Sequence, residues 1–442
     1  MIPITAIVLG AGNRGANAYG SYGLEHPNEL DVVAIADPDV ERRTRMATAH
    51  DIEPALQFET WEAALARPKL AQVAFITTQD NMHVGPTIAA LEAGYDVLLE
   101  KPMATSPADC AFLVETAERL GRTLQICHVL RYTNFFSTLY DIIRSGRLGE
   151  IVSIDHRENV AWYHMAHSFV RGNWGVEADS NPMILAKCCH DLDILLWIMG
   201  QKVAKLTSYG SLFHFRPQAA PAGATLRCQG DGNGVCPAAA TCMFYAPRLY
   251  NAEPQNAVPS DFTFTASGFM LNALGGGNSP QSRWDKLKTS QYGRCVYHCD
   301  NDVVDRQVIA LEFENGVPCT FTMHGHSDRE NRTMRWDGTK ATLYAEFGYA
   351  EFQEIRICDH GGMYHAVKEE VIVPPPAGSG HGGGDHGLVR DFLLAVQGQP
   401  SPRQTTARAS LESHLLAFAA EASRKSGISI DFAAYKNQVV QI

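Results

Sequence analysis

The feature that most constrains this chain is an apolar strand that runs directly into a glycine-rich turn. Residues 4–9 form the expected strand, and residues 10–15 carry the pattern G-x-G-x-x-G. In this pattern the first glycine permits a tight turn, the second lets the backbone approach a pyrophosphate, and the third lets the next helix pack on the strand. The chain therefore opens as a dinucleotide-binding α/β fold, and we assign cofactor contacts to Gly10, Gly12, Asn13, Arg14 and Gly15.

A second apolar strand, residues 32–36, ends in Asp37. A carboxylate at that place can accept hydrogen bonds from the hydroxyl groups of the adenosine ribose. The same carboxylate would repel a 2′-phosphate group, so Asp37 favours NAD over NADP. Arg42 and Arg43 follow closely and leave NADP as the alternative.

Composition limits the class of protein. With 442 residues, 45% of them apolar, the chain is long enough for two domains. A net charge of −11 gives no general attraction to nucleic acid or to anionic membranes, and the apolar runs are too short for a transmembrane helix. Eleven cysteines, several of them adjacent or crowded, favour a reducing compartment. We therefore expect a cytoplasmic enzyme that binds neither nucleic acid nor membranes.

Alternating strands and helices predict a doubly wound parallel sheet over residues 1–128. Beyond the two strands already named, strands are expected at 73–78, 96–100 and 123–127, and helices over 84–93 and 107–120. Such a sheet is the core of a Rossmann domain.

The pattern changes after residue 128, where strand-like segments follow one another with few helices between them. They lie at 150–158, 203–215, 303–313, 317–324, 332–345 and 350–358. This run predicts an α+β domain, residues 129–442, with a large, open, mainly antiparallel sheet. A helix is expected at 184–199, and the final segment 385–426 should contain two more, at 388–396 and 407–426. Asp385 would cap the helix at 388–396. Residues 251–300 show no periodicity.

Several motifs together resemble the Gfo/Idh/MocA family, named after glucose–fructose oxidoreductase and inositol dehydrogenase. They are the glycine fingerprint, Asn81 and His83, Glu100-Lys101-Pro102, His128-Val-Leu-Arg131, Gly146-Arg-Leu-Gly149, and a helix with Cys189-His190-Asp191-Leu-Asp193. The resemblance covers nearly the whole chain. It implies a Rossmann domain, NAD or NADP, sugar or cyclitol substrates, and an open sheet that often joins subunits, so we expect a homo-oligomer, a dimer or tetramer.

The resemblance also implies which residues form the site. We add further cofactor contacts to those of the glycine turn: Thr77, Thr78, Asn81, His83, Glu100, Lys101 and Arg131. The family's helix commonly reads D-x-G-x-H-x-x-D, but Ala186 stands at its first acidic position here and Lys187 follows. The usual carboxylate partner of the histidine is therefore absent from this helix.

Hydride transfer from a carbinol requires a group that removes the hydroxyl proton. Lys101 is the first candidate, because it follows a strand at the edge where the cofactor binds. Lys187 and His190 are three residues apart on the expected helix and would share a face. We predict Lys101, Lys187 and His190 as the catalytic residues; the alternatives are solvated lysines and a core histidine.

The densest polar and aromatic segment, residues 156–174, is typical of a sugar-binding wall. Aromatic rings pack on the C–H faces of sugars, and guanidinium groups match anionic oxygens. We predict substrate contacts from Arg157, Trp162, Tyr163, His164, His167, Arg171 and Trp174; an interface loop is the alternative. Together with Lys187, the two arginines would suit an acidic or sulfonated sugar.

A cysteine-rich loop, residues 214–245, forms a separate candidate site. Cys228, Cys236 and Cys242 lie within it, with His214 nearby. Three thiolates and one imidazole can complete a tetrahedral structural zinc site. The spacing is wider than C-x-x-C, so free thiols are the alternative.

We conclude from the sequence that the chain is an NAD-dependent enzyme that transfers hydride at a sugar carbinol, as a sugar or cyclitol dehydrogenase. The alternative within the same family is a redox-neutral glycoside hydrolase. There, transient oxidation at C3 permits elimination of the aglycone, addition of water and return of the hydride, and a further base must remove the C2 proton. A third alternative is a non-catalytic, cofactor-sensing regulator, which the presence of Lys101 and His190 argues against.

Overall fold

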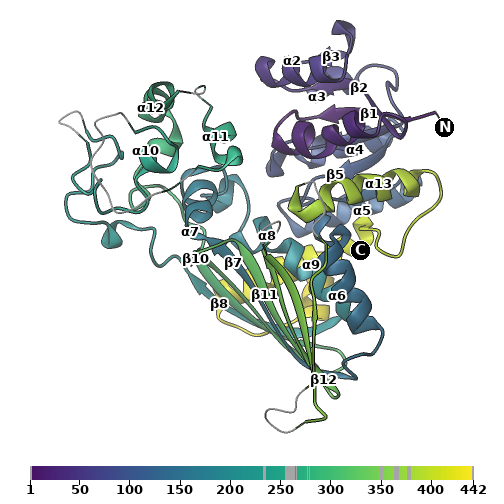
Figure 1. Ribbon diagram of the computed structural model, residues 1–442. Coiled ribbons are helices and arrows are strands. Elements are labelled where there is room, and N and C mark those ends of the chain that lie inside the picture. Colours follow the sequence, from purple (N-terminus) through teal and green to yellow (C-terminus); the bar gives the residue numbers. More distant parts are fainter. Residues whose placement is uncertain are drawn as a thin grey trace.

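The computed structural model describes residues 2–231, 235–253, 264, 266–275, 277, 279–348, 352–362, 368–375 and 380–440. Two sheets with helices packed around them dominate this part of the chain (Figure 1). Within the same ranges, no helix combines the length and apolar character that a membrane crossing requires.

Six parallel strands form the first sheet, in the order β3-β2-β1-β4-β5-β6. They are β1 (Ile4–Leu9), β2 (Leu30–Ala36), β3 (Gln57–Phe58), β4 (Val73–Ile76), β5 (Asp96–Leu99) and β6 (Leu124–Ile126). The helices of this part are α1 (Ser21–Glu25), α2 (Val40–Ala49), α3 (Trp61–Leu65), α4 (Val84–Glu92) and α5 (Pro107–Leu120). This strand order is that of a doubly wound dinucleotide-binding sheet, so the predicted Rossmann fold is confirmed.

Local sequence explains where these helices begin. The side chains of Asp39, Thr60 and Ser106 accept hydrogen bonds from backbone N–H groups in the first turns of α2, α3 and α5. Such caps satisfy donors that a helix cannot pair internally. Gly121 adopts a left-handed conformation, with φ at 60°, directly after α5 and ends that helix.

The second sheet has nine strands among the described residues, in the order β14-β13-β12-β11-β7-β10-β9-β8-β15. They are β7 (Ile151–Ala161), β8 (Val203–Ser211), β9 (Arg306–Phe313), β10 (Pro318–Ser327), β11 (Asn331–Gly338), β12 (Ala341–Gly348), β13 (Phe352–Asp359), β14 (Glu369–Ile372) and β15 (Ile430–Asp431). Only β7 and β10 pair in parallel among these strands. The predicted large, mainly antiparallel sheet is confirmed.

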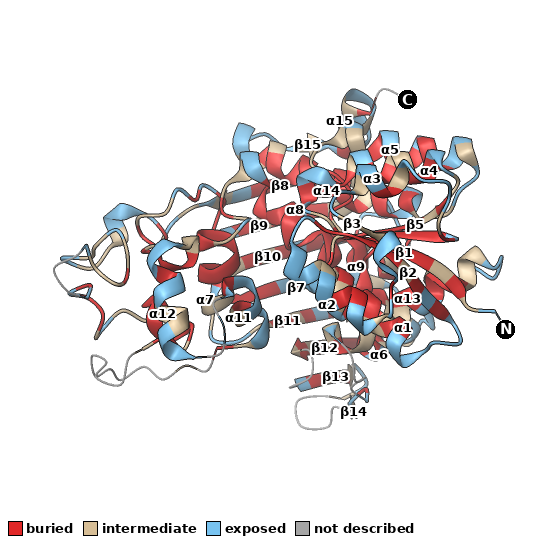
Figure 2. Cartoon of the chain, turned by 90° about the horizontal axis from the view of Figure 1, so that it is seen from above, coloured by how far each residue is buried: buried red, intermediate tan, exposed pale blue. Residues whose placement is uncertain are grey.

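Helices cover one face of the second sheet, and its other face is exposed. The covering layer includes α6 (Asn134–Arg144), α8 (Met183–Ala186), α9 (Cys189–Met199) and α14 (Ala407–Ser426), with α14 lying against both β8 and α9. Buried and exposed residues alternate along β9 and β10, as expected for strands with one solvated face. The strands of both sheets are largely buried, whereas α2, α11 and α12 present exposed surfaces (Figure 2).

A separate lobe lies to one side of the second sheet (Figure 1). Its helices are α7 (Trp162–His164), α10 (Ala246–Leu249), α11 (Gly268–Leu274) and α12 (Pro280–Thr289), around a small apolar core of their own. The two larger helices, α11 and α12, fall in residues 251–300, where the absence of periodicity allowed no prediction. Residues 254–263 lie outside the described ranges.

Three details differ from the sequence predictions. The segment 332–345 is not one strand, because a turn at Thr339 and Lys340 separates β11 from β12. The expected helix 184–199 is interrupted at Lys187 and Cys188, between α8 and α9. The sequence prediction also missed α6, the short elements β3, α3, β14 and β15, and α15 (Phe432–Val439), which follows the last predicted helix.

The end of the chain returns to the first sheet. Helix α13 (Gly384–Val396) packs its Phe392 ring against Phe75 of β4, with ring centroids 6.1 Å apart. Thr405 exchanges hydrogen bonds with Ile126 of β6, donating from its hydroxyl at 2.5 Å and accepting from the Ile126 N–H at 2.9 Å. Residues about 300 positions apart thus complete one core.

Candidate active site

The glycine-rich turn is pressed against the end of β4. Gly10 has φ of +105°, and a Cβ there would lie 2.6 Å from the Thr77 carbonyl oxygen. A Cβ on Gly15 would lie 1.9 Å from the Gly10 carbonyl oxygen. Neither position therefore accepts a side chain. A Cβ on Gly12 would meet nothing within 4 Å, so the space beside this residue is open to a ligand such as a pyrophosphate.

Asp37 lies beside this turn, directly after β2. Its side chain is buried, and Oδ2 accepts a hydrogen bond of 2.6 Å from the Ala11 N–H while Oδ1 accepts one of 2.8 Å from the Asp39 N–H. Arg43 donates to the Asp37 carbonyl oxygen. The carboxylate is thereby fixed at the edge of the sheet where the predicted ribose would lie.

The loop after β4 supplies the next part of the edge. Thr77 donates from its hydroxyl to the Gly10 carbonyl oxygen at 2.6 Å, and Thr78 donates to Met82 at 3.4 Å. Asn81 is exposed and donates to the Asp179 carbonyl oxygen across the domain boundary. These three residues line the edge as predicted, and their contact with a cofactor stays a prediction.

His83 does not lie at this edge. It is fully buried, with Nδ1 2.7 Å from the Pro102 carbonyl oxygen and Nε2 3.2 Å from that of Thr78. The two ring nitrogens face the loops after β4 and β5, and the predicted cofactor contact stays a prediction. His83 instead ties these two loops together.

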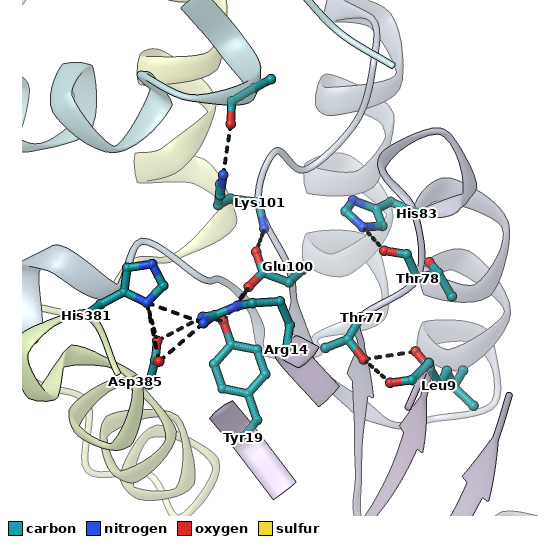
Figure 3. A network of polar contacts seen from close by, with 12 residues as sticks. Leu9, Arg14, Tyr19, Thr77, Thr78, His83, Glu100, Lys101, His381 and Asp385 are labelled. Atoms are coloured by element: carbon teal, nitrogen blue, oxygen red, sulfur yellow. Dashed lines mark hydrogen bonds and ion pairs between the residues drawn. The ribbon is translucent and has the colours of Figure 1, made fainter. Parts of the chain in front are cut away.

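Arg14 leaves the glycine turn and joins two carboxylates (Figure 3). Its guanidinium group donates to Glu100 and, at 2.8 Å, to Asp385, and the Tyr19 hydroxyl donates to Glu100 at 2.6 Å. Burial opposes these charges, but the nearby Arg14 holds the pKa values of both Glu100 and Asp385 below their usual ranges. The expected cap by Asp385 is wrong, since the residue lies inside α13 and uses its carboxylate here.

Lys101 points from the end of β5 toward the second domain (Figure 3). Its Nζ donates to the Ala186 carbonyl oxygen at 2.8 Å, and its backbone N–H donates to Glu100. His190, on α9, is buried next to His128 and His381, with ring centroids 5.6 and 6.3 Å away. Burial and the nearby Lys101 lower the pKa of His190 well below its usual value. The imidazole is therefore neutral near neutral pH.

Lys187 has different surroundings from His190. Its Nζ lies 3.2 Å from Glu158 of β7 and donates to Glu330, which stands between β10 and β11. Glu330 also accepts from His164 at 3.1 Å. The shared helix face predicted for Lys187 and His190 is wrong, because the helix is interrupted where the lysine turns toward these carboxylates.

The pKa values of the two carboxyl groups around Lys187 are shifted in opposite directions. Burial raises the pKa of Glu158 to about 7, although Arg332 lies 2.9 Å away and Lys187 is close. Burial also opposes the charge of Glu330, but His164 and Lys187 keep the pKa of that carboxyl well below its usual value. The positive charge of Lys187 is therefore neutralised within the protein.

Two predicted arginines bind elsewhere. Arg131 is buried and donates from Nε and Nη2 to Asp193 at 2.7 and 2.5 Å, and its predicted cofactor contact stays a prediction. Arg157 is exposed, whereas its neighbours His156 and Glu158 are buried. Since side chains alternate along a strand, Arg157 lies on the open face of the sheet, and its predicted substrate contact stays a prediction.

Arg171 pairs with backbone carbonyl groups, and its predicted substrate contact stays a prediction. Its side chain is fully buried and donates to the carbonyl oxygens of Arg294 and Phe244, both at 2.7 Å. Its Nη2 lies 3.5 Å from the sulfur of Cys228. This arginine braces the cysteine-rich loop.

The same neighbourhood excludes the predicted zinc site. Within the described ranges, no three of the ligand atoms of Cys228, Cys236, Cys242 and His214 lie within 4.8 Å of one another. His214 instead faces the Tyr297 hydroxyl at 3.2 Å. The guanidinium group among the cysteines opposes a divalent cation electrostatically, so the zinc prediction is wrong for these four residues.

The predicted aromatic wall divides into two parts. Trp162 and Tyr163 lie on α7, and both rings contact Phe264, at centroid distances of 5.6 and 5.1 Å. His167 is buried and stacks on Tyr292 at 4.7 Å, and burial lowers its pKa to about 3. His167 is therefore part of the lobe's interior, and its predicted substrate contact stays a prediction.

Trp174 lies at the boundary between the domains, where its indole N–H donates to Asp80 at 3.0 Å. It lines a cleft there with residues of the first domain. His164, also predicted to contact the substrate, is held by Glu330. Contacts of Trp162, Tyr163, His164 and Trp174 with a substrate stay predictions.

Comparison with known proteins identifies the family. The sequence profile of the Gfo/Idh/MocA oxidoreductases with an NAD-binding Rossmann fold matches residues 4–128. The profile of the same family's C-terminal alpha/beta domain matches residues 141–432. The chain belongs to the Gfo/Idh/MocA family. An NAD-binding oxidoreductase fold follows from this membership.

Two curated members of the Gfo/Idh/MocA family are similar over part of their length. Inositol 2-dehydrogenase of Streptomyces avermitilis is 31% identical over 208 residues, which are 45% of this chain and 54% of the relative. D-glucoside 3-dehydrogenase of Escherichia coli is 26% identical over 207 residues, 46% of this chain and 56% of the relative. The chain thus spans about half the length of these relatives.

Solved structures share the whole fold. A levoglucosan dehydrogenase in complex with NADH and L-sorbose superposes with a TM-score of 0.69 at 16% identity. The superposition covers 98% of this chain and 99% of that one. At this identity the likeness establishes the Gfo/Idh/MocA fold alone.

The sequence did not indicate that four charged or polar residues belong to the site: Glu158, Glu330, His381 and Asp385. Glu330 is 143 residues from Lys187, and Asp385 is 371 residues from Arg14. No spacing rule joins such distant positions. The only available signal was the glycine-rich stretch before α13, which predicts a turn but not its partner.

Proposed function

We propose that the chain is an NAD-dependent dehydrogenase that oxidises a carbinol of a neutral sugar, glycoside or cyclitol. The observation that carries this proposal is the position of Lys101. Its ammonium group leaves the cofactor edge of the first sheet and reaches Ala186, in the segment that leads to His190. The names of the relatives, an inositol and a D-glucoside dehydrogenase, agree with such substrates.

The residues at the edge fit NAD. The space beside Gly12 accepts a pyrophosphate, and the fixed carboxylate of Asp37 accepts ribose hydroxyl groups. Gly12, Asp37, Thr77, Thr78 and Asn81 would hold the cofactor. Bound NAD would supply the acceptor for the hydride.

Lys101 and His190 handle the proton in this proposal. Lys101 in its unprotonated form removes the hydroxyl proton of the carbinol, and the Ala186 carbonyl oxygen orients its Nζ. His190 is neutral near neutral pH, so its imidazole can bind the same hydroxyl or accept the proton from Lys101 and pass it to solvent. Lys187 does not transfer the proton in this proposal, because its ammonium group is paired with the carboxylates of Glu158 and Glu330.

The substrate is neutral in this proposal. The expectation of an acidic or sulfonated sugar as substrate depended on Arg157, Arg171 and Lys187. The first lies on the open sheet face, the second is buried under the cysteine-rich loop, and the third is paired with carboxylates. These cations therefore give no support to an anionic substrate.

A redox-neutral glycoside hydrolase is the second candidate, and one observation favours it. His381 lies beside His190, with its Nδ1 3.1 Å from a carboxylate oxygen of Asp385. A histidine oriented by a carboxylate is a suitable base, and this mechanism needs one more base than a dehydrogenase does.

Isotope and cofactor balance distinguish the two candidates. The purified protein is incubated with NAD and a panel of free sugars, cyclitols and aryl glycosides in D₂O, and NADH absorbance and released phenol are followed. A dehydrogenase forms one NADH per substrate and leaves C2 unlabelled. Phenol release without NADH and with deuterium at C2 would replace the dehydrogenase by the hydrolase. The absence of both products from the whole panel would refute the proposed function.

A further inference from the structure

A polar cleft lies at the boundary between the first domain and the lobe. Its volume is about 450 Å³, within the range of small-molecule sites, about 300–1,000 Å³. Three segments line it: residues 79–81 after β4, residues 172–180 before α8, and a third wall that includes Gln291 and Arg294. Asn81 of this lining faces the cofactor in the proposed function, whereas the rest of the cleft has no role in it.

Hydrogen bonds connect the lining of the cleft with the Lys101 centre on two sides. β4 and β5 are neighbours in the parallel sheet, and His83 bonds the loop after β4 to Pro102, the residue after Lys101. On the other side, Asn181 donates to Asp80 at 3.0 Å and stands five residues before Ala186, which accepts from Lys101. A substrate bound at Lys101 can therefore extend into the cleft.

The walls of the cleft match hydroxyl groups. Amide side chains, which both donate and accept hydrogen bonds, come from residues of both domains: Gln79, Asn81, Asn173 and Gln291. Gln291 donates to Asn173 at 3.0 Å, so the two walls that carry them are already joined. The indole ring of Trp174 is fixed by Asp80 and offers an aromatic surface for the C–H face of a sugar.

The charges of the cleft select against an anionic ligand. Three carboxylates line it, from Asp80, Asp179 and Asp300. The cation of the lining, Arg294, is paired with Asp300 at 2.6 Å. A phosphate, carboxylate or nucleotide group would therefore meet net repulsion, whereas a neutral polyol would not.

We propose that this cleft is a second carbohydrate subsite, which binds the neutral sugar attached to the ring that is oxidised at Lys101. This inference rests on the proposed function and narrows its substrate class to glycosides with a neutral, hydroxyl-rich partner group, disaccharides in particular. A free monosaccharide or cyclitol would fill only the Lys101 site.

The test compares the full-length protein with Gln291→Ala and with the matched control Gln281→Ala, which truncates an exposed glutamine on α12. The substrates are methyl glucosides and three neutral disaccharides: cellobiose, maltose and trehalose. For the disaccharide that the parent uses best, Gln291→Ala should lower the ratio of its kcat/KM to that of the methyl glucoside about fivefold, the loss of one hydrogen bond. Gln281→Ala should keep the parent ratio. Asn173→Ala, on the facing wall, serves if Gln291→Ala does not fold.

An unchanged ratio in both cleft variants would overturn the subsite. A rise in the KM of NAD with an unchanged ratio would overturn it too, since the cleft would then belong to the cofactor. If no sugar is oxidised, the proposed function fails, and calorimetric titration of the three disaccharides into the protein with NADH decides the subsite alone. Binding by the parent that Gln291→Ala loses would support it, and no binding by the parent would overturn it.

Discussion

Two buried charge clusters lie on the cofactor and substrate sides of Lys101, and in each a cation contacts two carboxylates; the substrate side has a second cation, Arg332, 2.9 Å from Glu158. On the cofactor side, Arg14 joins Glu100 and Asp385; on the substrate side, Lys187 joins Glu158 and Glu330. A guanidinium group donates in several fixed directions at once, whereas an ammonium group is a compact point charge. Both carboxylates beside Arg14 have lowered pKa values, but the pKa of Glu158 is raised to about 7.

The difference teaches that similar composition does not give similar charge behaviour. The cofactor side keeps its charges over a wide pH range, because Arg14 satisfies every carboxylate it meets. The substrate side gains or loses a proton near neutral pH, because Glu158 faces Asp191 and Glu330 as well as its two cations. Binding of the cofactor should therefore depend less on pH than turnover does.

The largest expected effect lies between the clusters, at Lys101. Lys101→Ala should fold and bind NAD like the parent but lose at least about a hundredfold in kcat, the low end for a positioned acid–base group. Steady-state kinetics and NAD titration measure both quantities. Lys288→Ala, an exposed lysine on α12, is the control. Equal turnover of the two variants would remove Lys101 from the chemistry.

Replacing one carboxylate of the cofactor-side cluster by a neutral side chain measures how much this cluster contributes to the stability of the protein. Asp385→Asn leaves Arg14 with one buried carboxylate, so we expect the free energy of unfolding to fall by about 2 kcal/mol and NAD to bind more weakly. Urea unfolding with and without NAD measures both. The exposed pair of Asp328 and Arg329 gives the control Asp328→Asn. If the stability of Asp385→Asn matches this control, the cluster is not structural.

Asp37 tests the cofactor side without touching the cluster. Asp37→Ala removes the acceptor for the ribose hydroxyls, so the KM of NAD should rise about tenfold while the KM of NADP rises less, because repulsion of the 2′-phosphate is lost. Kinetics with each cofactor give the two values. A parallel rise for both cofactors would contradict the assigned role.

Glu158 tests the pH response of the substrate side. A carboxyl whose pKa is raised on folding contributes stability at low pH, and this contribution is lost as pH rises from about 4.5 toward 7. The parent should therefore lose on the order of 1 kcal/mol between pH 5 and 8 relative to Glu158→Gln, which cannot ionise. Unfolding curves across this range show the difference. Parallel pH profiles would mean that Glu158 is ionised throughout.

The smallest effect is expected at Arg157. Since its side chain lies on the open face of the second sheet, Arg157→Ala should change kcat and KM less than about twofold, the size of a typical surface effect of a few tenths of a kcal/mol. The same kinetic assay measures it. A large rise in the KM of the substrate would show that Arg157 does contribute to substrate binding.

The sequence predicted the first sheet well because strand, turn and acid lie close together in the chain. The glycine turn and Asp37 occupy one edge, as their spacing indicates. The partners of the arginines could not be predicted from the sequence, because a guanidinium group binds whichever acceptor the fold brings near. Arg131 and Arg171 meet their partners only after the chain has folded. Burial of His167 could not be predicted either, because its neighbour Tyr250 is 83 residues away.

The return of the chain end to the first sheet has a consequence for synthesis. The first 128 residues leave the ribosome long before α13, which supplies Phe392 to their apolar core, and before Thr405, which bonds β6. A nascent chain therefore holds an unfinished crevice, with Arg14 lacking Asp385, for most of its translation. Domains generally fold as units in the order of their synthesis, but this one must wait for nearly the last of its residues.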